Sequence, residues 1–366
     1  MTPVGGDPDE TDVLLRVEGR AGHVTLNRPE KLNALTHPMV RTIDAALAAW
    51  ASDPAVAAVV LTGAGERGLC AGGDIRLFHD DARTGDGRAS SAFWADEYRL
   101  NARIARFPKP YVAVMDGIVM GGGVGVSAHG SVRIVTERSQ VAMPETAIGL
   151  APDVGGTYLL ARAPGELGTH LALTGAPVGA ADAVLCGLAD HFVPSVLVPM
   201  FLASLAGSPV PEGLARYAAE PPAGELSGHR SWIDHCYAAD SVEEIVERLL
   251  GCGIPEAKAT ADTILTMSPT ALKVTLAALR RARSLGSLGS LERVLEQEYR
   301  VSCAALSSPD LVEGIRARII DKDRDPRWSP ASLRDVTDET VARFFAPLGE
   351  RELTIVLDDL LQEVPQ

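Results

Sequence analysis

Two glycine-rich segments, each placed directly after an apolar run, constrain the fold of this chain more than any other feature. The apolar run Tyr111–Met115 leads into glycines 121–123, and the earlier run 57–62 leads into the segment 68–75. A strand that runs into glycines and then into a helix leaves backbone N–H groups free at the helix start. Two such turns, brought together in the fold, can aim two N–H donors at one oxygen atom, as an oxyanion hole requires.

Carboxylic acids follow the second glycine segment closely. Glu145 comes directly after Met143-Pro144 in an apolar stretch, where partial desolvation is expected to raise its pKa toward a catalytic range. The same position also suits a surface carboxylate at a helix start. Asp153 precedes Val-Gly-Gly and could equally be a helix N-cap, while Glu97 by pattern alone is an ordinary helical acid. Oxyanion donors beside paired acids indicate acyl chemistry.

Charge and cysteine content exclude several classes of protein. The 366-residue chain carries a formal net charge of −14, which argues against a nucleic-acid partner because phosphate binding needs a basic face. No apolar run approaches the roughly 18 to 20 residues that span a bilayer, so no membrane partner is expected. The five cysteines are scattered without a Cys-x-x-Cys pair, and the histidines show no metal spacing. This pattern predicts a reducing, cytoplasmic location and no metal site.

The spacing of apolar residues predicts an α/β body followed by helices. A unit of two strands and a helix recurs along the chain, and strand signals fade beyond about residue 165. Within the body, residues 80–90 are expected to form a mobile surface loop. We predict four parts: a disordered acidic tail (1–12), an α/β core (13–205), a linker rich in proline and glycine (206–230) and a helical C-terminal region (231–366).

Two common glycine motifs fit this chain poorly. The segment Gly123-Val-Gly-Val-Ser-Ala128 formally matches the dinucleotide fingerprint, but only about eight residues separate its glycines from the next strand, too few for a parallel crossover. It also lacks the Gly-Lys-Ser/Thr ending of a P-loop. Ser127 and His129 resemble half of a nucleophile elbow, yet two positions apart on a helix they would point to different faces. A packed serine is therefore the favoured interpretation.

Several longer motifs carry a family resemblance. In the first half of the chain they are Arg28-Pro-Glu-Lys-Leu-Asn-Ala-Leu35, Cys70-Ala-Gly-Gly-Asp-Ile75, Gly117-Ile-Val-Met-Gly-Gly-Gly123 and the segment from Met143 to Gly156. In the helical part they include Ser268-Pro-Thr-Ala-Leu-Lys273, Glu298-Tyr-Arg300 and Ile320-Asp-Lys-Asp323. With these motifs the chain resembles the crotonase (enoyl-CoA hydratase/isomerase) superfamily from about residue 12 to residue 348.

The resemblance implies a fold and a set of site residues. The fold is α/β, a crotonase-like spiral of strand-strand-helix (ββα) units with a C-terminal helical region. By resemblance, the N–H groups of Gly73 and Gly122 form the oxyanion hole for a thioester carbonyl, and Glu97 is a third acid near the substrate. The path of CoA, which is part of the substrate and not a separate cofactor, would be lined by the segments 28–34 and 71–75, with Lys31, Ala34, Ala71, Gly72, Asp74 and Ile75.

The acids distinguish branches of this superfamily. Family hydratases carry two glutamates, one just after the glycine triplet and one at the position of Glu145. Here Gly125 replaces the first glutamate and leaves room at its position, while Asp153 stands where hydratases usually have glycine. Both departures match the hydrolase branch, in which Glu145 and Asp153 would be the acting carboxylates. Adding water to a double bond needs two carboxylates around one water, whereas thioester hydrolysis needs an oxyanion hole and one base or nucleophile with an orienting partner.

The leading hypothesis is therefore an acyl-CoA thioester hydrolase that acts on a short branched 3-hydroxyacyl group, as in valine breakdown. A hydratase, isomerase or decarboxylase on the same scaffold is one alternative, and a non-catalytic CoA-binding protein is the other. The resemblance implies an acyl-CoA thioester as the binding partner and is compatible with a homo-oligomer.

Overall fold

A large, mostly parallel sheet carries the fold of this computed structural model, which describes residues 11–285 and 290–356. β1 (Val13–Glu18) pairs antiparallel with β2 (Ala21–Leu26), and each later pair of neighbours is parallel. The strands, in spatial order, are β1 (Val13–Glu18), β2 (Ala21–Leu26), β3 (Ala58–Gly63), β5 (Tyr111–Met115), β7 (Val132–Val135) and β9 (His191–Phe192). Most of the predicted acidic tail lies outside the described residues.

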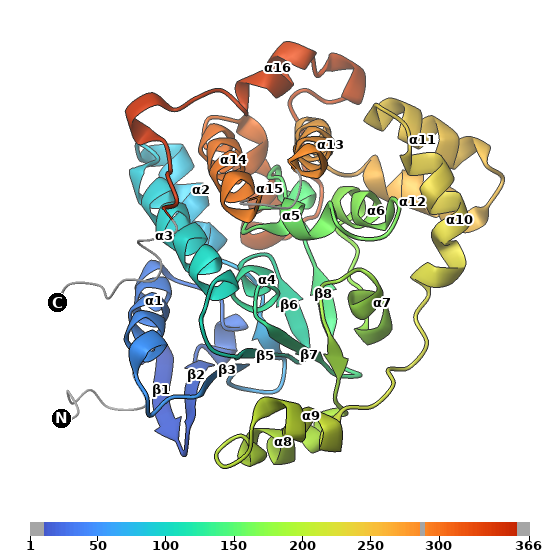
Figure 1. Ribbon diagram of the computed structural model, residues 1–366. Coiled ribbons are helices and arrows are strands. Elements are labelled where there is room, and N and C mark those ends of the chain that lie inside the picture. Colours follow the sequence, from blue (N-terminus) through green and yellow to red (C-terminus); the bar gives the residue numbers. More distant parts are fainter. Residues whose placement is uncertain (1–10, 286–289, 357–366) are drawn as a thin grey trace.

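A second, smaller sheet holds β4 (Gly68–Cys70), β6 (Ile118–Met120) and β8 (Gln140–Ala142), all parallel. The chain repeatedly places one strand in the large sheet and the next in the small sheet: β3 and β4, β5 and β6, then β7 and β8. This alternation is the predicted spiral of ββα units (Figure 1). Because the three short strands are parallel, their carboxyl ends meet at one edge, where both glycine turns and Glu145 follow.

Helices surround the two sheets and form the second half of the chain (Figure 1). In the body they are α1 (His37–Ser52), α2 (Ile75–Thr84), α3 (Arg88–Ala105), α4 (Gly122–Ser127), α5 (Gly156–Leu160), α6 (Leu167–Thr174), α7 (Ala180–Leu185), α8 (Val198–Ser204) and α9 (Val210–Tyr217). They continue with α10 (Leu226–Tyr237), α11 (Val242–Gly251), α12 (Pro255–Ile264), α13 (Pro269–Ser284), α14 (Ser290–Ala305), α15 (Pro309–Ile315) and α16 (Asp338–Arg343). Short 3-10 turns include η1 (Pro29–Lys31) and η2 (Glu145–Ile148), and a π-helical turn extends α15 (Arg316–Ile320).

Helix starts follow their sequence signals. The Thr36 hydroxyl accepts a hydrogen bond from the Met39 N–H at the start of α1, and Ser241, Ser268 and Ser308 cap α11, α13 and α15 in the same way. Each of these side-chain oxygens satisfies a backbone donor that the first helical turn leaves without a partner.

The prediction of a loop over residues 80–90 is wrong. α2 continues to Thr84, and α3 already begins at Arg88. The polar residues here belong to helices that are buried on one face, since Phe78 of α2 is buried. The Asp81 carboxylate accepts hydrogen bonds from the N–H groups of Gly87 and Ser90, so it ties the short connection to the start of α3.

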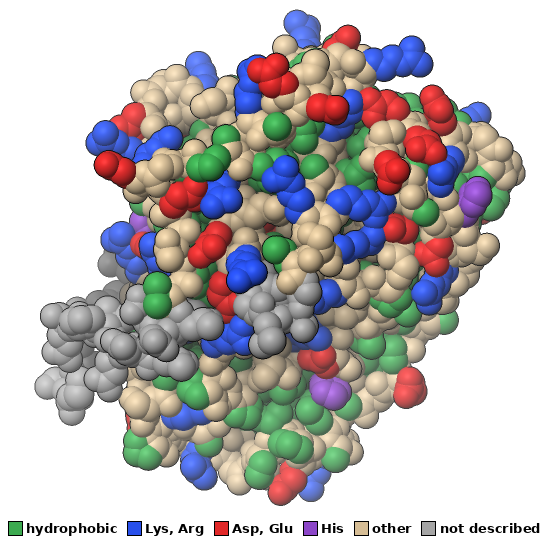
Figure 2. All heavy atoms as spheres, turned by 45° about the horizontal axis from the view of Figure 1, so that its top comes forward, with side chains coloured by type: hydrophobic (Ala, Val, Ile, Leu, Met, Phe, Trp, Pro, Cys, Tyr) green, Lys and Arg blue, Asp and Glu red, His purple; other side chains and the backbone are tan. Residues whose placement is uncertain are grey.

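One large apolar cluster extends from Val13 in β1 to Ile355 near the end of the described chain, and α13 and α14 pack on α5 (Figure 1). The segment 206–230 contains α9, whose Val210 joins a smaller cluster around Phe201. The division into a core, a linker and a helical region stays a prediction. On the face that shows the C-terminal helices, acidic and basic side chains are interspersed (Figure 2), which is typical of a solvated surface.

Candidate active site

The two glycine turns meet at the edge of the small sheet. Gly73 lies between β4 and α2, and Gly122 is the first residue of α4. A Cβ atom built on Gly122 would lie 3.2 Å from the Gly73 nitrogen, and one built on Gly72 would lie 3.6 Å from the Gly122 nitrogen. Among the described residues, neither the Gly73 N–H nor the Gly122 N–H has an acceptor. Two free backbone donors therefore lie side by side, as an oxyanion hole requires.

The first turn is fixed by the segment that precedes α1. The Leu35 N–H donates to the Gly72 carbonyl over 2.8 Å, and the Asp74 N–H donates to the Leu35 carbonyl over 2.9 Å. Gly72 has a φ of +113° and Gly121 has a φ of +50°. Residues other than glycine rarely adopt these backbone angles. Glycine at these positions lets both turns place the following N–H toward the same space.

Glu145 lies beside the second turn, at the start of η2. Its side chain is buried, and a Cβ atom built on Gly121 would lie 2.9 Å from Glu145 Oε1. Glu145 Oε2 has no hydrogen-bond partner among the described residues. Burial raises the pKa of Glu145 well above its ordinary value, and the nearby Asp153 charge raises it further. The alternative of a surface carboxylate at a helix start is therefore excluded.

Glu97 reaches the same place from α3. The residue is 2% exposed, and a Cβ atom built on Gly122 would lie 2.7 Å from Glu97 Oε1. That oxygen also has no partner within the described part of the chain. Burial raises the pKa of Glu97 well above its ordinary value, with a further contribution from the Asp153 charge. Glu97 is thus a buried acid at the glycine turns and not an ordinary helical acid.

Asp153 is not a helix cap. The N-cap of α5 is Gly155, and Asp153 Oδ2 instead accepts a 2.8 Å hydrogen bond from the Tyr98 hydroxyl. Asp153 is buried, and its pKa rises to about 6 because burial outweighs the opposing effect of the Tyr98 hydrogen bond. Its charge affects the pKa of both Glu97 and Glu145, so the three acids lie close together.

The expectation that Gly125 leaves open room is wrong. A Cβ atom built on Gly125 would lie 2.7 Å from the Val154 Cβ and 3.0 Å from Asn101 Nδ2. Val154 reaches this space because its backbone has a φ of 52°, a conformation that is strained for a β-branched residue. The position of the missing acid is therefore occupied by the Val154 side chain and the Asn101 amide.

Replacing Gly125 with alanine should destabilise the protein by about 1–3 kcal/mol, because the added methyl group overpacks the contact with Val154. Urea denaturation measures the change. Gly228→Ala, in α10, is the matched control, since a Cβ there meets nothing within 4 Å. A Gly125→Ala variant as stable as Gly228→Ala would contradict this packing.

Residues outside the predicted set also line this region. Asn101 is fully buried, and neither its Oδ1 nor its Nδ2 has a partner among the described residues. It lies one helical turn after Glu97 on α3, and this spacing is the signal that could have revealed it.

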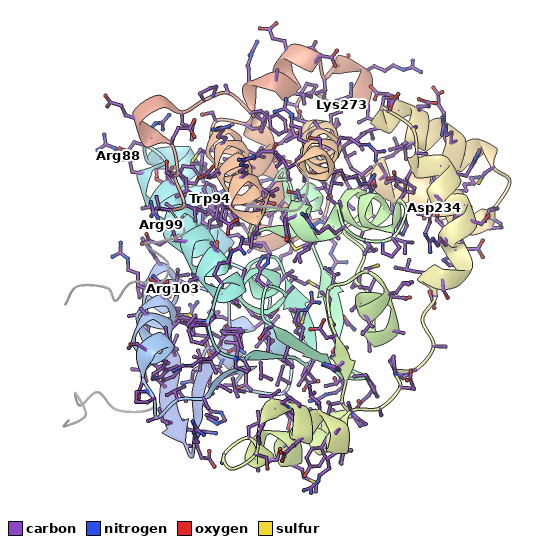
Figure 3. The ribbon with its side chains drawn as sticks, in the orientation of Figure 1. Arg88, Trp94, Arg99, Arg103, Asp234 and Lys273 are labelled. Carbon is purple, nitrogen blue, oxygen red and sulfur yellow. The ribbon has the colours of Figure 1, made fainter. Side chains whose placement is uncertain are left out.

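Figure 3 shows the outer side of α3, where Arg88 and Arg99 project, and Trp94 among the neighbouring helices.

The two segments expected to line a CoA path lie against each other. The Ala71 N–H donates to the Leu32 carbonyl over 3.0 Å, and Arg28 forms a 3.5 Å ion pair with Asp74. Lys31 is exposed, and the remaining predicted lining residues are buried or half-buried: Ala34, Ala71, Gly72, Asp74 and Ile75. The structure thus brings these residues together beside Gly73, and their role in CoA binding stays a prediction.

None of the described helices combines the length and apolar character that a membrane crossing requires. Across residues 11–285 and 290–356, no group of three or more His, Cys, Asp or Glu side chains is arranged to hold a metal ion.

Known proteins share this fold and these segments. Residues 21–345 match the enoyl-CoA hydratase/isomerase family, and the chain belongs to that family. A named relative, the mitochondrial 3-hydroxyisobutyryl-CoA hydrolase of Gallus gallus, is 44% identical over 355 residues, which cover 94% of this chain and 91% of the relative. The superfamily resemblance seen in the motifs is confirmed.

Solved structures confirm the fold as well. A carnitinyl-CoA dehydratase from Mycobacterium thermoresistibile is 55% identical with a TM-score of 0.90, and the match covers 94% of this chain and 98% of that one. An enoyl-CoA hydratase from Rhodobacter sphaeroides is 48% identical with a TM-score of 0.88, over 94% of this chain and 100% of that one. The relatives thus carry names from two reaction types, hydrolysis and hydration or dehydration.

Proposed function

We propose that this protein is an acyl-CoA thioester hydrolase that converts 3-hydroxyisobutyryl-CoA and water to 3-hydroxyisobutyrate and CoA. The observation that carries the proposal is the set of acids at the glycine turns: Glu145 and Asp153 are present, while the hydratase position holds Gly125. The name of the Gallus gallus relative supports the same reaction.

The proposed chemistry uses the free donors and the acids together. The N–H groups of Gly73 and Gly122 would hold the thioester oxygen and stabilise its negative charge when the carbonyl carbon is attacked. Glu145 would either attack that carbon itself or remove a proton from the attacking water. Collapse of the tetrahedral species breaks the carbon–sulfur bond, and the departing thiolate takes up a proton and leaves as CoA. If water attacks, the acid is released in the same step, and the proton that Glu145 accepted can pass to the sulfur. If Glu145 attacks, the acyl group remains on Glu145 as an anhydride, which a water molecule then hydrolyses to the free acid and the restored carboxylate. Because Glu145 acts when ionised and its pKa is raised, hydrolysis is expected to increase as the pH rises.

The names of the two solved structures favour hydration or dehydration as the second candidate. A hydratase needs a second acid that faces the β-carbon, and the family pattern puts it at position 125. Here Val154 lies where that side chain would begin. Hydration would therefore have to rely on Asp153 or Glu97 instead, which approach from other elements.

Changing Asp153 to asparagine should reduce CoA release from 3-hydroxyisobutyryl-CoA more than release from an acyl-CoA without the hydroxyl group. The carboxylate would orient the 3-hydroxyl or the water, and the amide loses both charge and acceptor strength. The ratio of kcat/KM for isobutyryl-CoA and 3-hydroxyisobutyryl-CoA measures the effect. Equal losses on both substrates would remove hydroxyl recognition from the role of Asp153.

A panel of acyl-CoA thioesters, assayed in parallel with a thiol reagent and by enoyl absorbance, tests the proposed function. Free thiol from 3-hydroxyisobutyryl-CoA supports hydrolysis. Loss of enoyl absorbance from crotonyl-CoA without thiol release would favour the hydratase alternative. Binding of CoA without either signal would favour a non-catalytic CoA-binding protein.

The site of action in the cell remains a separate proposal. The scattered cysteines favour a reducing, cytoplasmic location, and the sulfur of Cys70 is fully buried with its pKa raised to about 12 by burial. The Gallus gallus relative is named as mitochondrial. Fractionation of the source cells with antibody detection would distinguish these compartments, and size-exclusion chromatography with light scattering would test for the homo-oligomer.

A further inference from the structure

Tyr98 is the direct partner of the Asp153 carboxylate. Its hydroxyl lies 2.8 Å from Asp153 Oδ2 and 2.9 Å from the Ser302 hydroxyl, and all three residues are buried. A tyrosine has one O–H proton, which Tyr98 donates to the carboxylate. Ser302 therefore donates its own proton to the Tyr98 oxygen. The bonds run in one direction, from Ser302 through Tyr98 to Asp153.

α14, the helix that carries Ser302, also binds the backbone that follows Asp153. Glu298 lies one turn before Ser302 on α14, so both side chains leave the same helix face. Its carboxyl accepts hydrogen bonds from the Gly155 N–H over 2.6 Å and from the Thr157 N–H over 2.9 Å. These bonds lie directly after Val154, the residue with the strained backbone. α14 thus anchors the Asp153 segment through both its backbone and its side chain.

His129, which follows α4, also holds this segment. His129 Nε2 lies 2.7 Å from the Val154 carbonyl and donates to it. Burial lowers the pKa of His129 to about 4, so the ring is neutral and donates from this nitrogen near neutral pH. A strained backbone persists only where its surroundings hold it, and here the holding groups come from α14 and from the residues after α4.

We propose that Tyr98, supported by Ser302 of α14, is a positioning residue that holds the Asp153 carboxylate in its acting orientation and as an anion. The inference rests on the proposed hydrolase function for the role of Asp153 in the reaction. The hydrogen-bond network itself does not depend on that function. The helical C-terminal region thereby contributes to the active site through residues that do not touch the substrate.

The surroundings of Asp153 make this support necessary. A hydrogen bond to the charged form favours ionisation, and here the Tyr98 hydrogen bond acts against the burial that raises the pKa of Asp153. The pKa of Asp153 rises to about 6, whereas burial raises the pKa of Glu298 to about 8. The titratable groups that face Asp153 are Glu97 and Tyr98 from α3, Glu145 from η2, Glu298 from α14 and, through Val154, His129.

The test follows the titration of Asp153 directly. Protein labelled with ¹³C at the aspartate carboxyl carbons is titrated by NMR without substrate, and the Asp153 signal is assigned by its loss in Asp153→Asn. Tyr98→Phe removes the hydroxyl and keeps the ring, so the Asp153 midpoint should rise by about one pH unit. Ser302→Ala should also raise the Asp153 midpoint, but by less, because Tyr98 then loses the hydrogen bond that polarises its hydroxyl.

Tyr237→Phe is the matched control. Tyr237 is a fully buried tyrosine on α10, and its hydroxyl lies 3.0 Å from His170 Nδ1, away from the acid cluster. Its loss removes a buried hydrogen bond of the same kind and should leave the Asp153 midpoint unchanged. A shift in Tyr98→Phe without a shift in Tyr237→Phe supports the proposal.

An unchanged Asp153 midpoint in a folded Tyr98→Phe variant overturns the proposal. Should Tyr98→Phe fail to fold, an unchanged midpoint in Ser302→Ala overturns it instead. The titration needs no turnover, so it is separate from the hydrolase proposal. A wild-type protein that releases no CoA from any thioester counts against the proposed function alone.

Discussion

Replacing Glu145 with glutamine should abolish CoA release, with a loss of about 10² to 10⁴ in rate or more, because the change removes the only charge of the proposed base or nucleophile. The amide has nearly the same size, so binding of free CoA should stay within a few-fold of wild type. Thiol release under single-turnover conditions measures the first quantity, and calorimetric titration with CoA measures the second.

A matched control for this change is Glu292→Gln. Glu292 is also a buried glutamate with one oxygen that lacks a partner among the described residues, but it pairs with Arg106 over 2.8 Å, away from the glycine turns. Its replacement should leave turnover near the wild-type value. A Glu145→Gln variant with turnover as high as Glu292→Gln would remove Glu145 from the mechanism.

Loss of the Gly73 N–H should reduce kcat by about 10² to 10³, the effect of deleting one oxyanion donor. Gly73→Pro deletes that donor. Gly122 is less suitable, since any side chain there would meet Glu97 Oε1 at 2.7 Å and block the site as well. The atoms nearest to a Cβ on Gly73 would belong to Phe78 and Phe93 at 3.5 Å, which is ordinary van der Waals contact.

Gly73→Ala provides the comparison, because it adds a side chain and keeps the N–H group. It should lose much less activity than Gly73→Pro. Circular dichroism and thermal unfolding must show that both variants are folded, since proline also restricts the residue before it. Equal activities of the folded alanine and proline variants would mean that this N–H does not stabilise the transition state.

The features that could be predicted from the sequence are local ones. Apolar runs followed by glycines indicated the strands and the free N–H groups, because the strand period and the glycine turn are both encoded within a few residues. The apolar context of Met143-Pro144 indicated that Glu145 is buried for the same reason. The spiral of strand-strand-helix units followed from the repeated pattern along the chain together with the family resemblance.

Contacts between segments that are distant in the sequence could not be predicted from local sequence patterns. Asp153 meets Tyr98 across 55 positions, and Tyr98 meets Ser302 across 204 positions, so no spacing rule links them. The filling of the Gly125 space by Val154 depends on a left-handed backbone that valine rarely adopts, which its residue type argues against. Tertiary packing decided both features.

The most direct test of the central claim follows the fate of one substrate, 3-hydroxyisobutyryl-CoA, with the purified wild-type protein. Hydrolysis gives 3-hydroxyisobutyrate and free CoA, whereas dehydration gives methacrylyl-CoA with the thioester intact. Liquid chromatography with mass spectrometry separates these products in one reaction. We predict equal amounts of the free acid and CoA as the products. Conversion to methacrylyl-CoA without release of CoA would contradict the account and assign the acid cluster to the chemistry of hydratases.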